Sequence, residues 1–235
     1  MDPILTAARR AFYNLDGPWV RCRLFEALGS RRYSWPALNE IDRRLEPLLP
    51  NRPGTFIEAG AHDGYTQSNT YYLERFRGWR GVLVEAVPEL YLKAARRRPH
   101  SRVVQAALVG PERDGHEVIV HFGDLTSTIG DLALTKRGLD NAGRKPYDVH
   151  APGRTLSSIL DEAGLGRPDL LVLDIEGQEL EALRGLDLER HSPALMVIEM
   201  LDMAGQRPAV DRLLESHYEF MAALSPDDAV YRRRA

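Results

Sequence analysis

From residue 55 onward, short apolar runs alternate with segments of helical pattern, and this alternation constrains the fold more than any other feature. The runs cover Thr55–Ala59, Gly81–Glu85, Val103–Val109, Leu170–Ile175 and Ala194–Met200. Runs of this length and composition are typical of buried parallel strands that helices cover on both faces. The helices expected between them lie near Ser68–Arg77, Pro88–Arg98, Leu156–Ala163, Glu179–Leu183 and Ala209–Ser216. The sequence therefore predicts a doubly wound α/β fold.

The end of the chain predicts two further strands. Tyr218–Leu224 and Ala229–Arg233 flank Ser225-Pro226-Asp227-Asp228, a typical turn sequence. Two strands joined by so short a turn form an antiparallel hairpin. We therefore expect a mostly parallel seven-stranded sheet that ends in a C-terminal hairpin, and Glu117–Phe122 alternates well enough to form an additional strand.

Residues 1–51 are predicted to be accessory helices, which pack on the main domain at 52–235 or on a second subunit. Leu38, Ile41, Leu45 and Leu48 recur at helical spacing. Ser34 is expected to cap this helix, with Pro36 in its first turn. The earlier part, broken by Gly17-Pro18, is less regular.

One stretch of the main domain lacks any regular pattern. Residues 123–154 contain five glycines and two prolines among scattered charges. Long irregular segments in compact domains are usually lids, binding loops or disordered. We expect this segment to be a lid or substrate loop.

Composition excludes several classes of protein. Of 235 residues, 43% are hydrophobic, which is ample for a core, and the net charge of -3 argues against a protein built to grip nucleic acid. The single cysteine, Cys22, has no partner for an internal disulfide. No window approaches the ~20 apolar residues that cross a bilayer. We therefore predict no membrane partner and a cytoplasmic location.

The first strand runs directly into a loop with two glycines, Glu58-Ala59-Gly60-Ala61-His62-Asp63-Gly64. Ligands of open α/β sheets bind beyond the carboxyl ends of the strands, and glycines let the backbone approach them. The spacing is not the Gly-x-Gly-x-x-Gly pattern that holds a pyrophosphate. A plain tight turn is the alternative for this loop, and His62 could equally be a loop histidine bonded to backbone.

Two further strands end in residues that suit a nucleoside. Glu85 ends the second strand, where a carboxylate can accept both hydroxyls of an adenosine ribose. Ala106 and Ala107 follow the third strand and leave room for a flat adenine. A solvated acid at a helix start is an equally good explanation of Glu85 alone.

Three carboxyl groups follow the next two strands. Asp174 and Glu176 are two residues apart, so in extended geometry both point the same way, and Glu199 joins them from the fifth strand. Three such acids cannot all be close and ionised without a proton or a cation. The alternative is that Glu176 and Glu179 only cap the following helix, whose start favours negative charge.

These motifs, in this order, resemble the FkbM family of S-adenosylmethionine (SAM)-dependent O-methyltransferases. The resemblance rests on Phe56–Gly64, Ser68-Asn69-Thr70, Leu73-Glu74, Gly78–Gly81 leading to Glu85, and Asp174–Glu179. It covers roughly residues 56–186 and implies a class I, Rossmann-like methyltransferase that acts on hydroxyls of sugars and natural products. Gln178 stands where relatives often have His, so a general base is not available there.

The resemblance and the residue pattern imply the same cofactor, SAM. Glu58 and Asp174 are expected near its ammonium, the Gly60–Gly64 backbone at its methionine part, and Glu85 at its ribose. Ser68 and Asn69 could donate to its carboxylate. The residues expected to bind the cofactor are Glu58, Gly60, Ala61, His62, Asp63, Gly64, Ser68, Asn69, Glu85, Ala86, Ala106, Ala107 and Asp174.

A hydroxyl acceptor needs a base or a metal to remove its proton. We expect Glu176 or a nearby histidine to be the base, and Asp174 and Glu199 to orient the acceptor or to hold Mg²⁺. No metal site is assigned beyond that option. His121 and His150 are weaker candidates for the acceptor pocket.

Two other functions stay open at this stage. An NAD-linked oxidoreductase shares the sheet but needs the missing phosphate-binding glycines. A non-catalytic cofactor-binding or interaction protein could use the N-terminal helices, which could also form a homodimer. The basic runs Arg96–Arg98 and Arg232–Arg234 are short and are interpreted as solvated residues rather than a nucleic-acid surface.

Overall fold

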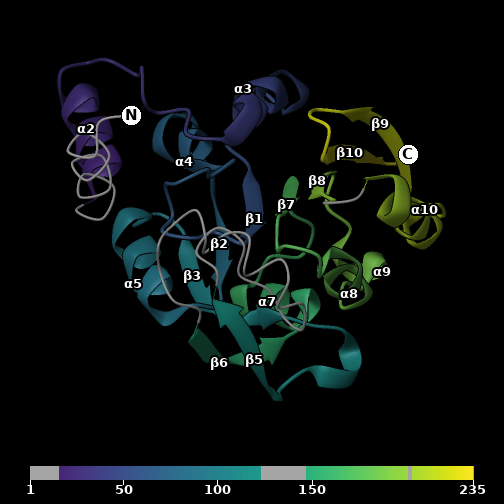
Figure 1. The fold of residues 1–235 in the computed structure, drawn as a ribbon. Coiled ribbons are helices and arrows are strands. Elements are labelled where there is room, and N and C mark those ends of the chain that lie inside the picture. Colours follow the sequence, from purple (N-terminus) through teal and green to yellow (C-terminus); the bar gives the residue numbers. More distant parts are fainter. Residues whose placement is uncertain (1–15, 123–146, 201–202, 235) are drawn as a thin grey trace, which may run out of the picture.

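A seven-stranded sheet forms the centre of the molecule (Figure 1). The computed structural model describes residues 16–122, 147–200 and 203–234. The strands of the sheet follow the order β3-β2-β1-β7-β8-β10-β9. Their bounds are β1 Thr55–Ala59, β2 Arg80–Glu85, β3 Arg102–Gln105, β7 Leu170–Leu173, β8 Leu195–Glu199, β9 Tyr218–Ala223 and β10 Asp228–Arg233. Strands β3 to β8 of this order are parallel, and β10 is antiparallel to both neighbours. The predicted sheet and its terminal hairpin are confirmed.

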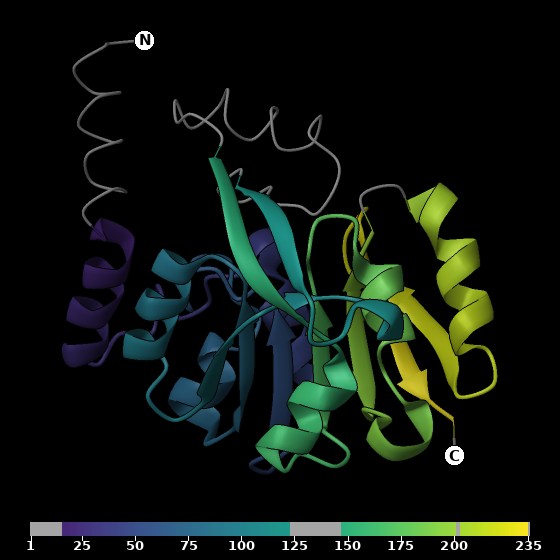
Figure 2. The same ribbon diagram turned by 90° about the horizontal axis from the view of Figure 1, so that it is seen from below.

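Helices cover both faces of the sheet, as the continuous apolar strands require (Figures 1 and 2). The helices are α3 Ile41–Leu45, α4 Tyr71–Arg77, α5 Pro88–Arg97, α7 Leu156–Ala163, α8 Glu179–Arg184, α9 Leu188–His191 and α10 Met203–Leu214. Side chains of α7, α8 and α10 pack with Ile57 in one apolar cluster, and those of α3 and α4 pack with Phe56 in another. Successive residues of β1 therefore face opposite layers.

The predicted third strand is wrong in its second half. It divides at Ala106, whose N–H donates to the carbonyl of Glu85, and the chain then leaves the main sheet. Ala107–Leu108 is a separate strand, β4, in a three-stranded sheet of order β4-β6-β5. In that sheet, β5 Glu117–Phe122 matches the prediction and pairs antiparallel with β6 Tyr147–Arg154.

Strand β6 also corrects the predicted irregular segment. Residues 147–154 form a regular strand in spite of Pro152 and Gly153, because β5 on one side and β4 on the other supply its ladder. The β5–β6 ribbon projects from the sheet (Figure 2). Residues 123–146, the rest of the predicted loop, lie outside the described residues.

The N-terminal part is helical but not as predicted. Helix α2 covers Gly17–Ala27, so Gly17-Pro18 lies in the first turn of a helix, and the helical stretch expected before it lies outside the described residues. The predicted helix from Ser34 to Leu48 is three short pieces, η1 Leu38–Glu40, α3 and η2 Glu46–Leu48. Asn39 and Glu40 have φ of 52° and 57°, which interrupts regular helix. Ser34 caps nothing, because its hydroxyl donates to Glu26.

The accessory part nevertheless belongs to the core. Ile41, Leu45 and Leu49 are buried in the cluster that contains Phe56 and Trp79. Residues 38–49 therefore pack on the sheet of the same chain. Within the part of the chain that the structure describes, no helix has the length and apolar content of a membrane span.

The close pairing of β1 and β2 generates the first testable prediction. Gly81 is the register partner of Phe56, and a Cβ on it would lie 2.1 Å from the Phe56 carbonyl oxygen. We expect Gly81→Ala to lower the free energy of unfolding by ~1–3 kcal/mol, as measured by urea denaturation, because backbone must shift. Gly166→Ala is the matched control, since nothing lies within 4 Å of its added Cβ. Equal stability of the two variants would contradict the register.

Candidate active site

The chain reverses direction across the sheet between β1 and β7. From β1 it proceeds outward to β2 and β3, and it later returns to β7 on the other side of β1. The segments that follow these two strands lead to strands on opposite sides of this point, and open α/β sheets bind ligands beyond the carboxyl ends of the strands at such a reversal. The loop after β1 and the acids after β7 both lie at this edge, as the sequence predicted.

A cavity of ≈ 280 Å³ opens at this edge. Of the fifteen residues proposed from the sequence, eleven line this cavity and four do not. The predicted residues that line it are Glu58, Gly60, His62, Asn69, Glu85, Ala86, Ala106, Ala107, Asp174, Glu176 and Glu199. Ala61, Asp63, Gly64 and Ser68 do not line it.

The four residues outside the lining build the loop instead. The carboxylate of Asp63 accepts from the N–H groups of Tyr65 and Thr66 and pairs with Arg97. Although burial acts to raise it, the pKa of Asp63 is held well below its usual range, first by His62 and then by the charge of Arg97. The hydroxyl of Ser68 bonds to Glu58. The Ser68 hydroxyl is thus directed into the protein, and its expected bond to a cofactor carboxylate stays a prediction.

The glycines of this loop are required by packing. Gly60 has φ +78°, and a Cβ on it would lie 1.7 Å from the carbonyl oxygen of Asp174. Gly64 has φ +79°, and its Cβ would lie 2.9 Å from Ala94 in α5. Gly60 therefore lets the turns after β1 and β7 meet, and only Gly60 of the two also lines the cavity.

A buried ion network holds the loop, and the sequence analysis missed it. Arg98 is 1% exposed, and its guanidinium donates to Glu74 at 2.8 Å and to Thr70 Oγ1 at 2.8 Å. It also lies 3.4 Å from Glu58, which accepts in addition from the N–H of Asn69 at 2.7 Å. The interpretation of Arg96–Arg98 as solvated is wrong for its last two members. Arg97 is the last residue of the amphipathic helix α5 and Arg98 follows it, a position that gave no signal of burial.

Glu58 is consequently a positioning residue in this structure. Its carboxylate is 3% exposed and accepts from three side chains and one backbone N–H. Glu58 lines the cavity, but its carboxylate oxygens are directed to these partners.

Glu85 ends β2 with its carboxylate directed at backbone. One oxygen accepts from the N–H of His62 and the other from that of Val87, each at 2.8 Å. Burial raises the pKa of Glu85 in spite of these bonds. Each oxygen retains a second lone pair, so the carboxylate can still accept hydrogen bonds from a ligand in the cavity.

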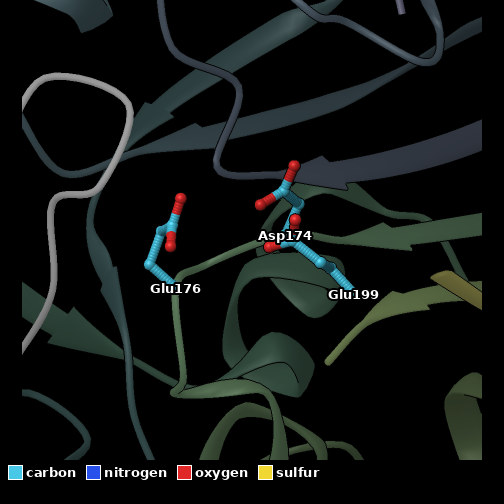
Figure 3. Close-up of side chains that lie close together, drawn as sticks. All are labelled: Asp174, Glu176 and Glu199. Carbon is cyan, nitrogen blue, oxygen red and sulfur yellow. The ribbon is translucent and has the colours of Figure 1, made fainter. Parts of the chain in front are cut away.

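Three acids meet at the ends of β7 and β8. Asp174, Glu176 and Glu199 each offer a carboxylate oxygen, and these oxygens lie within 4.8 Å of one another. Figure 3 shows Glu199 reaching from β8 to Asp174, with Glu176 beside them. The predicted convergence is confirmed, but its predicted reason is wrong. Glu176 has φ 55°, so the chain after Asp174 is a turn and not an extended strand.

The turn that carries Glu176 is held by Glu179. Its carboxylate accepts from the N–H groups of Ile175 and Gly177 at 3.1 and 3.0 Å. Glu179 therefore stabilises the turn that precedes α8, and this is the role it has in place of the simple helix cap considered from the sequence. Glu176 projects beside the cavity instead of capping the helix.

Proximity and burial keep protons on this cluster. Burial and the nearby charges of Asp174 and Glu179 raise the pKa of Glu176 to about 8. Asp174 and Glu199 share a hydrogen bond, and burial raises the pKa of both. Near neutral pH the three carboxyl groups are therefore not all ionised, and protons can move on and off the cluster. Carboxylate oxygens also suit Mg²⁺, which stays a prediction.

Some cavity residues were not predicted at all. Leu38 and Ile41 reach it from the N-terminal part, and Gln67 from the loop after β1. Asp228 belongs to the hairpin, where the sequence analysis assigned only a turn, and it is the register partner of Glu199. The antiparallel pairing of β10 on β8 could not be aligned from the sequence, so this fourth acid was missed.

The candidate histidines of the β5–β6 ribbon lie elsewhere. The Nδ1 atoms of His121 and His150 contact Asp148 and Glu117, respectively, each at 2.8 Å across the ribbon. Neither histidine lines the cavity. The prediction that they face the acceptor is not supported by this structure, since both are occupied by cross-strand acids.

The Arg98 network generates a stability prediction. Arg98→Met removes the cation and leaves Glu58 and Glu74 buried, so we expect the free energy of unfolding to fall by about 3–5 kcal/mol. Arg96→Met, on the exposed side of the same helix, is the control and should change little. Urea denaturation of both variants measures the difference. If Arg98→Met were as stable as the control, the network would not hold the loop.

Comparison with known proteins agrees with this architecture. Residues 58–232 match the sequence model of the Methyltransferase FkbM domain. Methyltransferase sdnD of Sordaria araneosa is 36% identical over 96 residues, which cover 35% of this chain and 37% of that protein. Methyltransferase 1 of Beauveria bassiana is 34% identical over 87 residues, which cover 36% and 34%. The matches thus span about a third of these curated relatives.

Two solved structures of proteins named as methyltransferases have a similar arrangement of strands and helices. Methyltransferase FkbM from Methylobacillus flagellatus aligns with a TM-score of 0.48 at 16% identity, over 77% of this chain and 43% of that one. A TehB-like SAM-dependent methyltransferase from Corynebacterium glutamicum aligns with a TM-score of 0.45 at 18% identity, over 97% and 100%. Because the family match extends over most of the described sheet and both sides of the cavity, the chain belongs to the FkbM methyltransferase domain family.

Proposed function

We propose that this chain is a SAM-dependent O-methyltransferase that transfers a methyl group to a hydroxyl of a sugar or natural-product acceptor. The observation that supports this most is the cavity at the reversal between β1 and β7, where Glu85 and the Asp174 cluster line one continuous space. Membership of the FkbM family supports the same activity. Cavities of this kind at such a reversal are the usual ligand sites of open α/β sheets.

The charge of the cavity suits SAM better than a dinucleotide. Its described lining contains six carboxyl groups and neither lysine nor arginine. A pyrophosphate would meet only negative charge there, and the glycine pattern that holds one is absent. SAM has no phosphate, and its sulfonium and ammonium groups are attracted by carboxylates. The donor set therefore favours SAM over NAD.

The residues divide along the cavity by chemistry. Glu85 would accept hydrogen bonds from the ribose hydroxyls through its remaining lone pairs. Ala86, Ala106 and Ala107 would flank the adenine, because their small side chains leave a flat space. Asp174 would face the ammonium group.

The turn after β1 completes the cofactor site in this proposal. Gly60, His62 and Asn69 line the same space beside Asp174. The neighbouring Asp63, Gly64 and Ala61 would act by fixing the loop, since they lie outside the lining. When bound, SAM supplies an activated methyl group on a sulfonium sulfur.

Glu176 is the residue best placed to act as the base. It lines the cavity beside Asp174, and its pKa of about 8 lies close to physiological pH, where a general base is most effective. Its carboxylate would hold the acceptor hydroxyl and take its proton. Glu199 and Asp174 would orient the acceptor.

A non-catalytic binding protein is the competing function. It would keep the cofactor residues but would not need a titrating acid such as Glu176.

A homodimer through the N-terminal helices and a cytoplasmic location belong to the proposal as further expectations, together with the absence of nucleic-acid partners.

Ligand binding tests the cofactor assignment. We expect isothermal titration to show binding of SAM and of S-adenosylhomocysteine and no binding of NAD. Glu85→Gln should weaken binding about tenfold or more, because one charged acceptor for the ribose is lost. The control, Glu89→Gln, changes an exposed acid one turn later. Binding of NAD in preference to SAM would reject the proposal.

The pH dependence of turnover tests the base. Glu176 must be ionised to accept a proton, so the rate should rise about tenfold per pH unit below a pKa near 8 and level off above it. Glu176→Gln should lower kcat by about 10²–10⁴-fold and abolish this rise. The control Glu181→Gln, on the outer part of α8, should keep both. A Glu176→Gln variant with normal kcat would show that another group is the base.

A further inference from the structure

The cavity extends across the carboxyl ends of β2, β1, β7 and β8 to the first residue of the antiparallel strand β10. Glu85 follows β2, and Glu199 and Asp228 belong to β8 and β10 on the other side of β1 and β7. With about 4.8 Å between neighbouring strands, β2 and β8 lie roughly 14 Å apart. If Glu85 holds the nucleoside, the β8–β10 end is left for the acceptor.

This acceptor end is anionic because the hairpin adds a fourth acid. Asp228 is 8% exposed, is the Cα partner of Glu199 in the β10–β8 ladder, and lines the cavity. Its carboxylate accepts from the hydroxyl of Ser225. Asp174 and Glu199 offer carboxyl oxygens within 4.8 Å of each other at the same end. Carboxyl groups gathered in this way suit a monovalent cation.

Buried acceptors without donors form an independent observation. Asn69 is 7% exposed and lines the same cavity, and its Oδ1 accepts no hydrogen bond from any residue that the structure describes. The same holds for Oε2 of Glu199. Buried polar atoms without partners are costly, so Asn69 Oδ1 calls for a donor from a molecule in the cofactor part of the cavity, and Glu199 Oε2 calls for one at the acceptor end.

Building on the proposed function, we propose that the acceptor is a hydroxyl compound that carries a protonated amine, which binds against Glu199 and Asp228 while its hydroxyl faces Glu176. In the transfer, the acceptor oxygen forms a bond to the methyl carbon and gives its proton to the Glu176 carboxylate. The C–S bond of SAM breaks, and its electron pair stays on sulfur as a neutral thioether. The amine keeps its charge throughout.

An apolar wall accompanies the acids. Leu38 and Ile41 line the cavity from the N-terminal part, and Val172 lines it from β7. An amine on a carbon skeleton offers both a cation and an apolar surface, whereas a bare metal ion offers only the charge.

Three methyl hexosides of similar size, used as probes, test this inference. The full chain is loaded with S-adenosylhomocysteine and titrated with methyl glucosaminide, methyl glucoside and methyl glucuronide, which are cationic, neutral and anionic near pH 7. We expect the glucosaminide to bind at least tenfold more tightly than the glucoside and the glucuronide not to bind.

A pair of variants locates the amine. Asp228→Asn should weaken glucosaminide binding about fivefold or more and leave S-adenosylhomocysteine binding unchanged. Asp227→Asn, the exposed neighbour in the same turn, should change neither. If Asp228→Asn does not fold, the comparison of the three probes on the unaltered chain still decides.

The outcomes separate this inference from the proposed function. Failure to bind S-adenosylhomocysteine would reject the proposed function. Normal binding of S-adenosylhomocysteine with no preference for the glucosaminide would overturn only the amine. Binding of Mg²⁺ alone that Asp228→Asn and Glu199→Gln abolish, and that displaces the glucosaminide, would likewise overturn it in favour of a metal.

Discussion

The contact between the turns after β1 and β7 is the constraint on which the site depends. Gly60 lies so close to the carbonyl of Asp174 that no side chain would fit between them. This contact brings the loop of β1 against the acids of β7, although more than a hundred residues separate them in the chain. The cavity lies beside this contact and is lined by residues of both turns.

Electrostatics gives this space its character. Six acids surround it, and only Glu58 among them is paired with a buried arginine, Arg98. Burial of the others raises the pKa of Glu85, Asp174 and Glu176. A cationic ligand relieves this unfavourable crowding, so the energy that destabilises the empty cluster favours binding of SAM.

The sequence predicted the elements better than their ends. Apolar periodicity located β1, β5 and α7 at their observed bounds because each is a continuous pattern. It placed Val103–Val109 in one strand, since a break at Ala106 between two sheets leaves no mark in hydropathy. Pro208 lies inside α10, where a proline more often begins a helix, and the predicted start after it was late by six residues.

Only the part of the site that consists of recognisable sequence motifs could be predicted. Strand-end acids identified Asp174, Glu176 and Glu199, because parallel strands align their carboxyl ends. Asp228 and Leu38 could not be found, since they reach the cavity through antiparallel register and through a turn with positive φ at Asn39. Arg98 was missed because burial of a charge depends on partners distant in sequence.

The crystal structure of the complex with S-adenosylhomocysteine would test the central claim most directly. The account predicts the ribose hydroxyls on Glu85, the adenine beside Ala106 and Ala107, and the sulfur directed toward Glu176. A ligand bound outside the β1–β7 crevice, or one turned so that its sulfur lies away from the three acids, would contradict it.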